Sequence, residues 1–97
     1  MTEISSKTII NRNSGIISNK LDDEIIMMSI EKGEYYGLNQ IASRIWEIIE
    51  NPISFDILIT HLTEEFEVSR EACIADVKTF LHLLEEKNLV IFTFPEE

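Results

Sequence analysis

The stretch Gly33–Trp46, which reads GEYYGLNQIASRIW, most constrains the fold because it joins a short strand directly to a helix. Its two adjacent tyrosines suit a pleated, half-buried strand over Glu34–Leu38. Gly37 interrupts this strand without a side chain, which often marks the close approach of another backbone. Asn39 is a good N-cap for the helix, since its side-chain oxygen can accept from a free amide of the first turn. A strand edge beside an apolar helix can accept a peptide as an added strand.

The segments before this stretch predict a small antiparallel sheet. The near-continuous apolar run in Glu24–Ile30 predicts a central strand that is buried on both faces. The tight connection Glu31-Lys32-Gly33 then returns Glu34–Leu38 antiparallel to it. Thr8–Asn11 is a candidate first strand, and if it pairs on the far side, Glu34–Leu38 is left at the sheet edge. Ile16–Lys20 is ambiguous between extended and irregular structure.

The remainder of the chain predicts three helices and a short C-terminal segment. We expect the helices from about Gln40 to Glu50, from a Ser54 cap to about Glu65, and from a Ser69 cap to near Lys87. Asn88 suits the left-handed position just past a helix end, and Leu89 can fold back on the last turn. Leu89–Phe94 is a short strand or an extended tail. The predicted fold class is therefore α+β, with a winged helix-turn-helix-like outline: a three-stranded antiparallel sheet followed by three helices. We expect one domain over residues 1–97 with flexible ends at about 1–6 and 95–97.

The third predicted helix has an unusually wide apolar face. Its centre is formed by Cys73, Val77, Phe80 and Leu84. The face is widened by Ile74 and Leu81 on one side and by Leu83 on the other. The face spans roughly 180°, whereas an ordinary surface helix has an apolar stripe of roughly 100°. Two explanations remain open: the helix is wedged between two core layers, or one of its flanks lines a groove that is open to a ligand.

The charge balance argues against a nucleic-acid partner. The chain has 18 acidic and 8 basic side chains and a formal net charge of −10. Nucleic-acid binding needs clustered Lys and Arg to replace counterions, and an anionic membrane surface also needs basic residues. Although a winged helix-turn-helix often reads DNA with its third helix, Arg70, Lys78 and Lys87 are outnumbered there by acidic residues. A basic or mainly apolar peptide is compatible with this charge, and so is a simple role in solubility.

No pattern typical of catalysis or metal binding is found in the sequence. Cys73 is the one cysteine, which excludes an internal disulfide and favours a cytoplasmic location. His61 and His82 are not paired at ligand spacing, and no glycine-rich phosphate loop is present. The N-terminus lacks the features of a signal peptide, and no apolar run has the length of a membrane span. We therefore expect a non-catalytic protein that uses no cofactor and no metal.

The order of several motifs resembles the PqqD-like family. These motifs are Asp23-Glu24 before an apolar strand, Gly33, Tyr35-Tyr36-Gly37-Leu38-Asn39, Ile45-Trp46-Glu47, and Asp76-Val77 with Phe80-Leu81 in the third helix. The resemblance extends from about Ile9 to Ile91, and Ala42 stands where many relatives have Gly. Members of this family, called RiPP recognition elements, bind the leader segment of a ribosomally made precursor peptide and present it to modifying enzymes. The pattern is most similar to the discrete leader-binding proteins of lasso-peptide pathways. A PqqD-type peptide chaperone for a radical SAM or other modifying enzyme is the alternative.

The resemblance implies a site made by a strand edge and a groove. The leader is expected to add as a strand at Glu34–Leu38, with its side chains entering a groove against the third helix. The implied peptide-binding residues are Glu34, Tyr35, Tyr36, Gly37, Leu38, Ile74, Asp76, Val77, Lys78, Phe80, Leu81 and Leu84. Of these, Tyr35 and Gly37 are expected to face the groove, and the role of Tyr36 stays open. The expected core supports are Leu38, Ile41, Ile45 and Trp46.

The partners implied by the resemblance are the precursor peptide, a leader peptidase and a cyclase of the same pathway. Because the side-chain period of a strand is two residues, a one-residue error in register would exchange its groove and core faces. Two readings from other classes remain: a small winged-helix regulator acting on DNA, and a subunit whose enzymatic function appears only in a larger complex.

Overall fold

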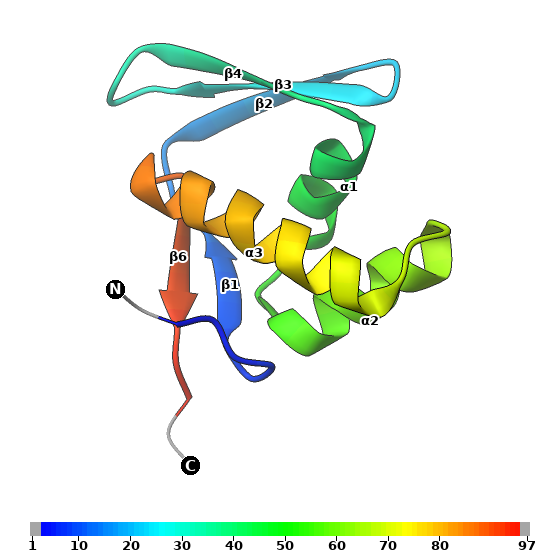
Figure 1. Cartoon of the computed structure of the whole chain (residues 1–97). Helices are drawn as coiled ribbons and strands as arrows, with labels where there is room; N and C mark the ends of the chain where they lie inside the picture. Colours follow the sequence, from blue (N-terminus) through cyan, green and yellow to red (C-terminus); the bar gives the residue numbers. More distant parts are fainter. Residues whose placement is uncertain (1–2, 96–97) are drawn as a thin grey trace.

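The structure, a computed structural model, describes residues 3–95 and contains two small antiparallel sheets and three helices in that range (Figure 1). The first sheet has the order β2 (Ile16–Leu21), β3 (Glu24–Ser29), β4 (Glu34–Leu38), and the second has the order β5 (Ile53–Ser54), β1 (Ile9–Arg12), β6 (Val90–Thr93). The helices are α1 (Gln40–Ile48), α2 (Phe55–Glu65) and α3 (Arg70–Glu86). The predicted α+β class, with an antiparallel three-stranded sheet before three helices and a short C-terminal strand, is confirmed.

The helices cover only one face of the first sheet (Figure 1). Along β3, Ile25 and Met27 are buried in the core, whereas Ile26 is 41% exposed on the opposite face. The predicted burial of this strand on both faces is therefore wrong, although its central position is confirmed. An apolar run shows that a strand is hydrophobic, but the number of covered faces depends on which elements pack against the sheet.

The strand that flanks β3 on its far side is β2, so the predicted pairing of Thr8–Asn11 in this sheet is wrong. A two-residue turn follows β2, and Asp22 adopts a left-handed conformation there with φ of 57°. Two-residue turns with positive φ favour β-hairpins, so this turn joins β2 directly to β3 as antiparallel neighbours. β1 instead pairs with β5 and β6 in the second sheet. The prediction that Glu34–Leu38 lies at the sheet edge is confirmed.

Side-chain caps begin each helix at the predicted residue. The side chains of Asn39, Ser54 and Ser69 accept from the backbone N–H of Ala42, Ile57 and Ala72. These bonds satisfy amides that have no partner inside the helix. The end of α3 also follows prediction, since Asn88 has a φ of 59° and the Leu89 N–H donates to the Leu84 carbonyl at 2.9 Å. Leu89 is fully buried, which returns the chain to the core as β6 begins.

The core lies between the first sheet and the helices, and β1 lies on the side of the core away from the first sheet (Figure 1). The Arg12 guanidinium stacks over the Trp46 ring at 4.3 Å, and its Nε donates to the Trp46 carbonyl at 3.1 Å. Burial lowers the pKa of Arg12, an effect that the carboxylates of Glu50 and Glu47 oppose. This contact joins β1 to α1.

The N-terminal segment is packed against the domain. Ile4 is buried in the core, and the Asp56 N–H donates to the Ser6 carbonyl at 3.0 Å. The packed part therefore begins at Ile4, within the range 1–6 that was predicted to be flexible; the expectation for residues 1, 2, 96 and 97 lies outside the described residues. No helix within 3–95 has the length and apolarity required to cross a membrane.

Candidate functional site

The outer edge of β4 is not paired with any strand of the described chain (Figure 1). At its C-terminal end, the Ser43 hydroxyl accepts from the Ile25 N–H at 2.8 Å and donates to the Leu38 carbonyl at 3.1 Å. The N–H of Ile25 and the carbonyl of its partner Leu38 thus point toward one another, with the Ser43 hydroxyl between them. Antiparallel pairs alternate between groups that face each other and groups that point away. The N–H and C=O groups of Tyr35 and Gly37 therefore point to the open edge.

The side chains of β4 alternate between the helix side and the opposite face of the sheet. Tyr35 is 72% exposed, whereas Leu38 is buried and Tyr36 packs against the core. The predicted orientation of Tyr35 and Gly37 toward the groove is therefore wrong, and Tyr36 takes that position. The physical reason is that the buried Leu38 places every second residue on the helix side.

Tyr36 is held on the helix side by two polar contacts. Its hydroxyl donates to the Glu34 carboxylate at 3.1 Å, and the Lys87 ammonium lies 5.3 Å from its ring centroid. Desolvation and then the Glu34 hydrogen bond raise the pKa of Tyr36. The phenol therefore stays neutral at physiological pH and continues to donate its proton to Glu34.

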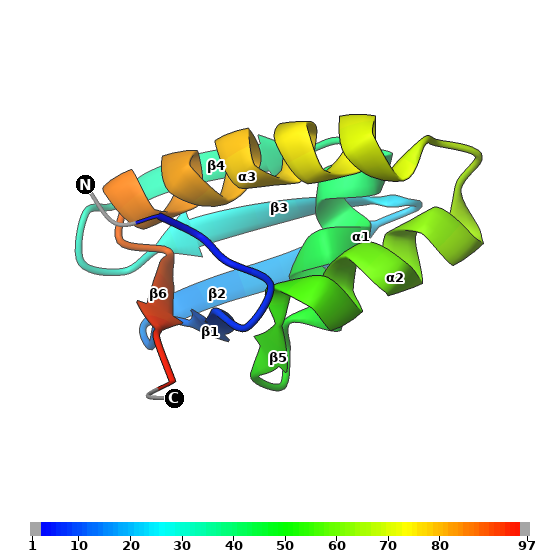
Figure 2. The same ribbon diagram turned by 60° about the horizontal axis from the view of Figure 1, so that its bottom comes forward.

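One flank of α3 points toward β4: the Lys87 ammonium at the C-terminal end of the helix lies against the Tyr36 ring, and the helix passes in front of β4 in the view of Figure 2. Lys87 marks one end of this flank through its contact with Tyr36, and Asp76 marks the other end beside Ile41 of α1. Residues at spacings of three and four share one side of a helix. Phe80 and Leu83 therefore lie between these two ends, and Leu83 is 47% exposed. We call this set (Asp76, Phe80, Leu83 and Lys87) the β4 flank.

An apolar cleft of about 80 Å³ lies at the Asp76 end of the β4 flank. Its lining comes from all three helices and from the α2–α3 connection, and includes Ile41, Phe66, Val68, Ala72 and Cys73. Burial raises the pKa of the Cys73 thiol, which keeps it protonated at neutral pH. The cleft therefore offers a small apolar recess with one carboxylate, Asp76, at its rim.

A bidentate ion pair holds the walls of this cleft together. Arg44 of α1 donates to the Glu65 carboxylate of α2 through Nε at 2.7 Å and through Nη2 at 2.9 Å. These hydrogen bonds lower the pKa of Glu65 and raise that of Arg44. Glu65 precedes Phe66, so the pair fixes the end of α2 where it contributes to the cleft.

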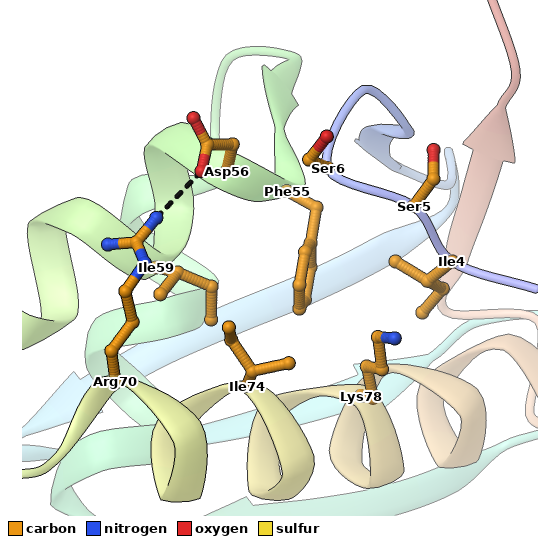
Figure 3. A pocket seen from close by; sticks show the side chains of 9 residues that line it. All are labelled: Ile4, Ser5, Ser6, Phe55, Asp56, Ile59, Arg70, Ile74 and Lys78. Carbon is orange, nitrogen blue, oxygen red and sulfur yellow. Dashed lines mark hydrogen bonds and ion pairs between the residues drawn. The ribbon is translucent and has the colours of Figure 1, made fainter.

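The other flank of α3 does not face β4. Ile74 and Lys78 line a separate cavity of about 160 Å³, which lies between α3, α2 and the N-terminal segment (Figure 3). Within this cavity the Lys78 ammonium lies 6.0 Å from the centroid of the Phe55 ring. The expected placement of Ile74 and Lys78 beside β4 is therefore wrong. The apolar face of α3 is wide because the helix packs against α2 on this side while the centre of the face belongs to the core.

The central face of α3 belongs to the core. Val77, Leu81 and Leu84 are buried, with Leu81 fully inaccessible, so their side chains support the β4 flank from the core. Val77 also contributes to the lining of the apolar cleft. Cys73 is buried as a small apolar residue, as expected. The explanation of a helix wedged between core layers thus applies to the centre of the face and to its Ile74 side.

Sequence reasoning missed several residues of this surface. Ile41, predicted as a core support, is 44% exposed and lines the cleft. Leu83 and Lys87 follow Asp76 at helical spacing, so the sequence pattern places them on the same side of α3 as Asp76. The pattern does not tell which side of α3 points toward β4. Ser43 gave no signal, because its role depends on two strands meeting beside the helix. Leu38, Ile45 and Trp46 are core residues as predicted.

The arrangement suits an extended peptide more than a small reacting molecule. Outward backbone groups on β4 can pair with a peptide backbone, and the β4 flank and cleft can receive side chains from one side of that peptide. Among the described residues, no group of three or more His, Cys, Asp or Glu side chains is positioned to hold a metal ion.

The family model described as Coenzyme PQQ synthesis protein D (PqqD) matches residues 24–90. This chain belongs to the PqqD family. The match runs from the first residue of β3 to the first residue of β6, so the PqqD region contains β4, all three helices and the cleft. The sequence resemblance to the PqqD-like family is thus confirmed.

Two solved structures share the fold of this PqqD-family chain. The structure described as TbiB1 in complex with the TbiA(beta) leader peptide is 26% identical, with a TM-score of 0.80 over 89% of this chain and 99% of that chain. The structure described as lasso peptide synthetase B1 complexed with the leader peptide is 23% identical, with a TM-score of 0.75 over 84% and 96% of the two chains. No curated protein sequence matches this chain.

Proposed function

We propose that this PqqD-family chain binds the leader segment of a lasso-type precursor peptide without itself catalysing a reaction. The observation that carries the proposal is the open edge of β4, whose outward backbone groups lie beside the partly apolar β4 flank of α3. The TbiB1 complex, which shares the fold, contains a leader peptide, and this supports the choice of ligand.

In this proposal the leader extends the first sheet as a fourth strand. Its backbone bonds to the outward groups of Tyr35 and Gly37, a contribution that tolerates many leader sequences. Alternate leader side chains then face the helix side, where Phe80 and Leu83 offer apolar contact. One leader side chain of moderate size fills the cleft beside Ile41, and this pocket supplies specificity.

The negative charge of the chain favours a leader with basic residues. Asp76 stands at the rim of the cleft, and the formal net charge of −10 adds a long-range attraction. A bound leader would hold its precursor near a leader peptidase and a cyclase of the pathway and raise its local concentration there. The protonated Cys73 thiol is unsuited to act as a nucleophile, which supports a non-catalytic role.

A fluorescence-anisotropy titration tests the proposal directly. A labelled leader from the lasso-type precursor of the same pathway is titrated with the protein, and a scrambled peptide of identical composition serves as the control. Saturable binding of the leader at about micromolar affinity or tighter, with much weaker binding of the scrambled peptide, is expected. Equal binding of both peptides would contradict specific recognition.

A parallel titration and a gel shift address the other readings. Preferential binding of the precursor of a radical SAM pathway would favour the PqqD-type chaperone. A gel shift with duplex DNA at low salt tests the regulator, because non-specific DNA binding is strong under that condition.

A further inference from the structure

The cavity between α2, α3 and the N-terminal segment, which we call the N-terminal cavity, is an apolar recess on the flank of α3 that does not face β4 (Figure 3). Its apolar lining comes from Ile4, Phe55, Ile59 and Ile74. The first three of these side chains are buried, so the packed core holds the walls in place. Its volume of about 160 Å³ is below the roughly 300–1,000 Å³ of pockets for larger ligands, so it suits a single apolar side chain.

Lys78 is a charged group of the N-terminal cavity without a counter-ion. Its ammonium lies 6.0 Å from the centroid of the Phe55 ring and, in the view of Figure 3, between Phe55 and Ile4. The chain has 18 acidic side chains, yet no carboxylate of residues 3–95 forms an ion pair with this ammonium. A cation beside apolar walls is stabilised by a partner of opposite charge, and a ligand can supply that partner.

The second cation of the cavity, Arg70, is already paired. Its Nη2 donates to the Asp56 carboxylate at 2.7 Å, and Figure 3 shows this pair at the end of the cavity away from Lys78. The two charges compensate each other there. The N-terminal cavity is therefore neutral at one end and positive at the other, a pattern that suits a ligand with one negative charge.

The rim contributes a hydroxyl group that is available to a ligand. The Ser6 hydroxyl has no hydrogen-bond partner within residues 3–95, whereas the Ser5 hydroxyl lies 3.3 Å from that of Thr8. A hydroxyl can donate to a carbonyl or accept from an N–H, so Ser6 suits a peptide group. The cavity thus offers one place each for an apolar side chain, a carboxylate and a backbone amide.

The last residue of a peptide chain carries these three groups together. We propose that the N-terminal cavity binds the C-terminal residue of a peptide or protein that ends in an apolar amino acid. The side chain enters between Phe55 and Ile74, the carboxylate binds the Lys78 ammonium, and a backbone amide meets the Ser6 hydroxyl. A fatty acid is less suited, because its long chain exceeds the cavity and it has no amide for Ser6.

This site is separate from the proposed leader-binding site. Ile74 and Lys78 lie on one flank of α3, whereas the β4 flank and the cleft beside Ile41 lie elsewhere on the helix. The two sites can therefore be occupied at the same time. The proposal does not depend on the proposed leader-binding function, and each can fail without the other.

An NMR titration that follows the backbone amide signals of the whole chain tests the site. The probe is N-acetyl-leucine, which has the side chain, carboxylate and amide of an apolar chain end. N-acetyl-leucinamide is the matched ligand without the charge, and octanoate has the charge but no amide. We expect saturable shifts at Ser6, Ile74 and Lys78 with N-acetyl-leucine, and binding about fivefold or more weaker with N-acetyl-leucinamide.

Two lysine variants separate the role of Lys78 from a general effect of charge. Lys78→Met removes the ammonium and keeps an apolar side chain, whereas Lys20→Met makes the same change in net charge on β2 of the first sheet. Lys78→Met should bind N-acetyl-leucine and N-acetyl-leucinamide equally, and Lys20→Met should keep the preference of the unmodified chain. Leader affinity, measured by anisotropy, should be the same in all three proteins.

Several results would overturn the proposal. Absence of saturable shifts at the cavity would show that it takes no such ligand. Equal binding of N-acetyl-leucine and N-acetyl-leucinamide by the unmodified chain, or a preference for the carboxylate that survives in Lys78→Met, would show that Lys78 does not hold the carboxylate. Tighter binding of octanoate than of N-acetyl-leucine would contradict a peptide end as the ligand. Failure of the leader to bind would instead refute the proposed function alone, because that measurement reports on the other flank of α3.

Discussion

Replacing Gly37 with proline is the sharpest test of strand addition at β4. The Gly37 N–H points to the open edge, so its removal takes away one donor without breaking a ladder bond to β3. Gly37 does not have a positive φ, and no atom lies within 4 Å of a Cβ placed there. Proline is tolerated on edge strands whose N–H faces solvent, so the domain should stay folded.

The expected loss follows from one missing hydrogen bond at the edge. A net backbone hydrogen bond contributes about 0.5–1.5 kcal/mol, and a buried carbonyl left without a partner costs about 1–3 kcal/mol. If the leader carbonyl that faces Gly37 becomes shielded from water, the second figure applies, and the loss of binding free energy is about 1–3 kcal/mol. Since about 1.4 kcal/mol corresponds to tenfold in affinity, the leader Kd should rise by about 5- to 150-fold.

Gly37→Ala is the matched control for this experiment. Alanine keeps the N–H and places its methyl group in open space, so its leader Kd should stay within about twofold of the unmodified protein. Anisotropy titrations give the affinities, and urea unfolding checks that both variants remain folded. Equal leader binding by the proline and alanine variants would refute the inference that this edge donates to the leader.

Three further predictions test the flank, the strand end and the cleft wall. Leu83→Ala should weaken leader binding several-fold in the anisotropy assay while Ile74→Ala leaves it unchanged, and the reverse order would show that the other flank of α3 binds the leader. Ser43→Ala should lower the free energy of unfolding in urea by about 1–3 kcal/mol, because it removes one partner from each of two buried backbone groups. Arg44 lowers the pKa of Glu65, so this pair stabilises the fold above the usual carboxyl pKa and is lost as pH falls through the lowered value. The difference in Tm between Glu65→Gln and the unmodified protein should therefore shrink from pH 6 to pH 3, and it should correspond to less than about 1 kcal/mol because both side chains are partly exposed.

Local chemistry made most of the secondary structure predictable. Each capping residue bonds an amide only three positions away, so Asn39, Ser54 and Ser69 mark helix starts without reference to the rest of the chain. The same holds for Asn88, whose left-handed conformation ends α3. The motif order around Tyr35 and Tyr36 was also sufficient to indicate the family, because it is a property of the chain alone.

The candidate site was predictable only in part. The sequence located its two elements, the β4 edge and α3, but it assigned Ile74 and Lys78 to the wrong flank, directed Tyr35 to the groove and left the role of Tyr36 open. A helical apolar face of about 180° has two flanks of similar composition, and nothing local tells which one meets a strand and which one meets another helix.

Those choices come from contacts between segments that are distant in the chain. β2 and not β1 completes the first sheet, and β1 pairs with β6 about 80 residues later, for example Asn11 with Ile91. These pairings set the side of α3 that lies along β4, and the burial of Leu38 sets which tyrosine faces it. Caps, turns and periodicity act through neighbours in sequence, whereas the facing of a strand and the flank of a helix depend on which surfaces become buried together.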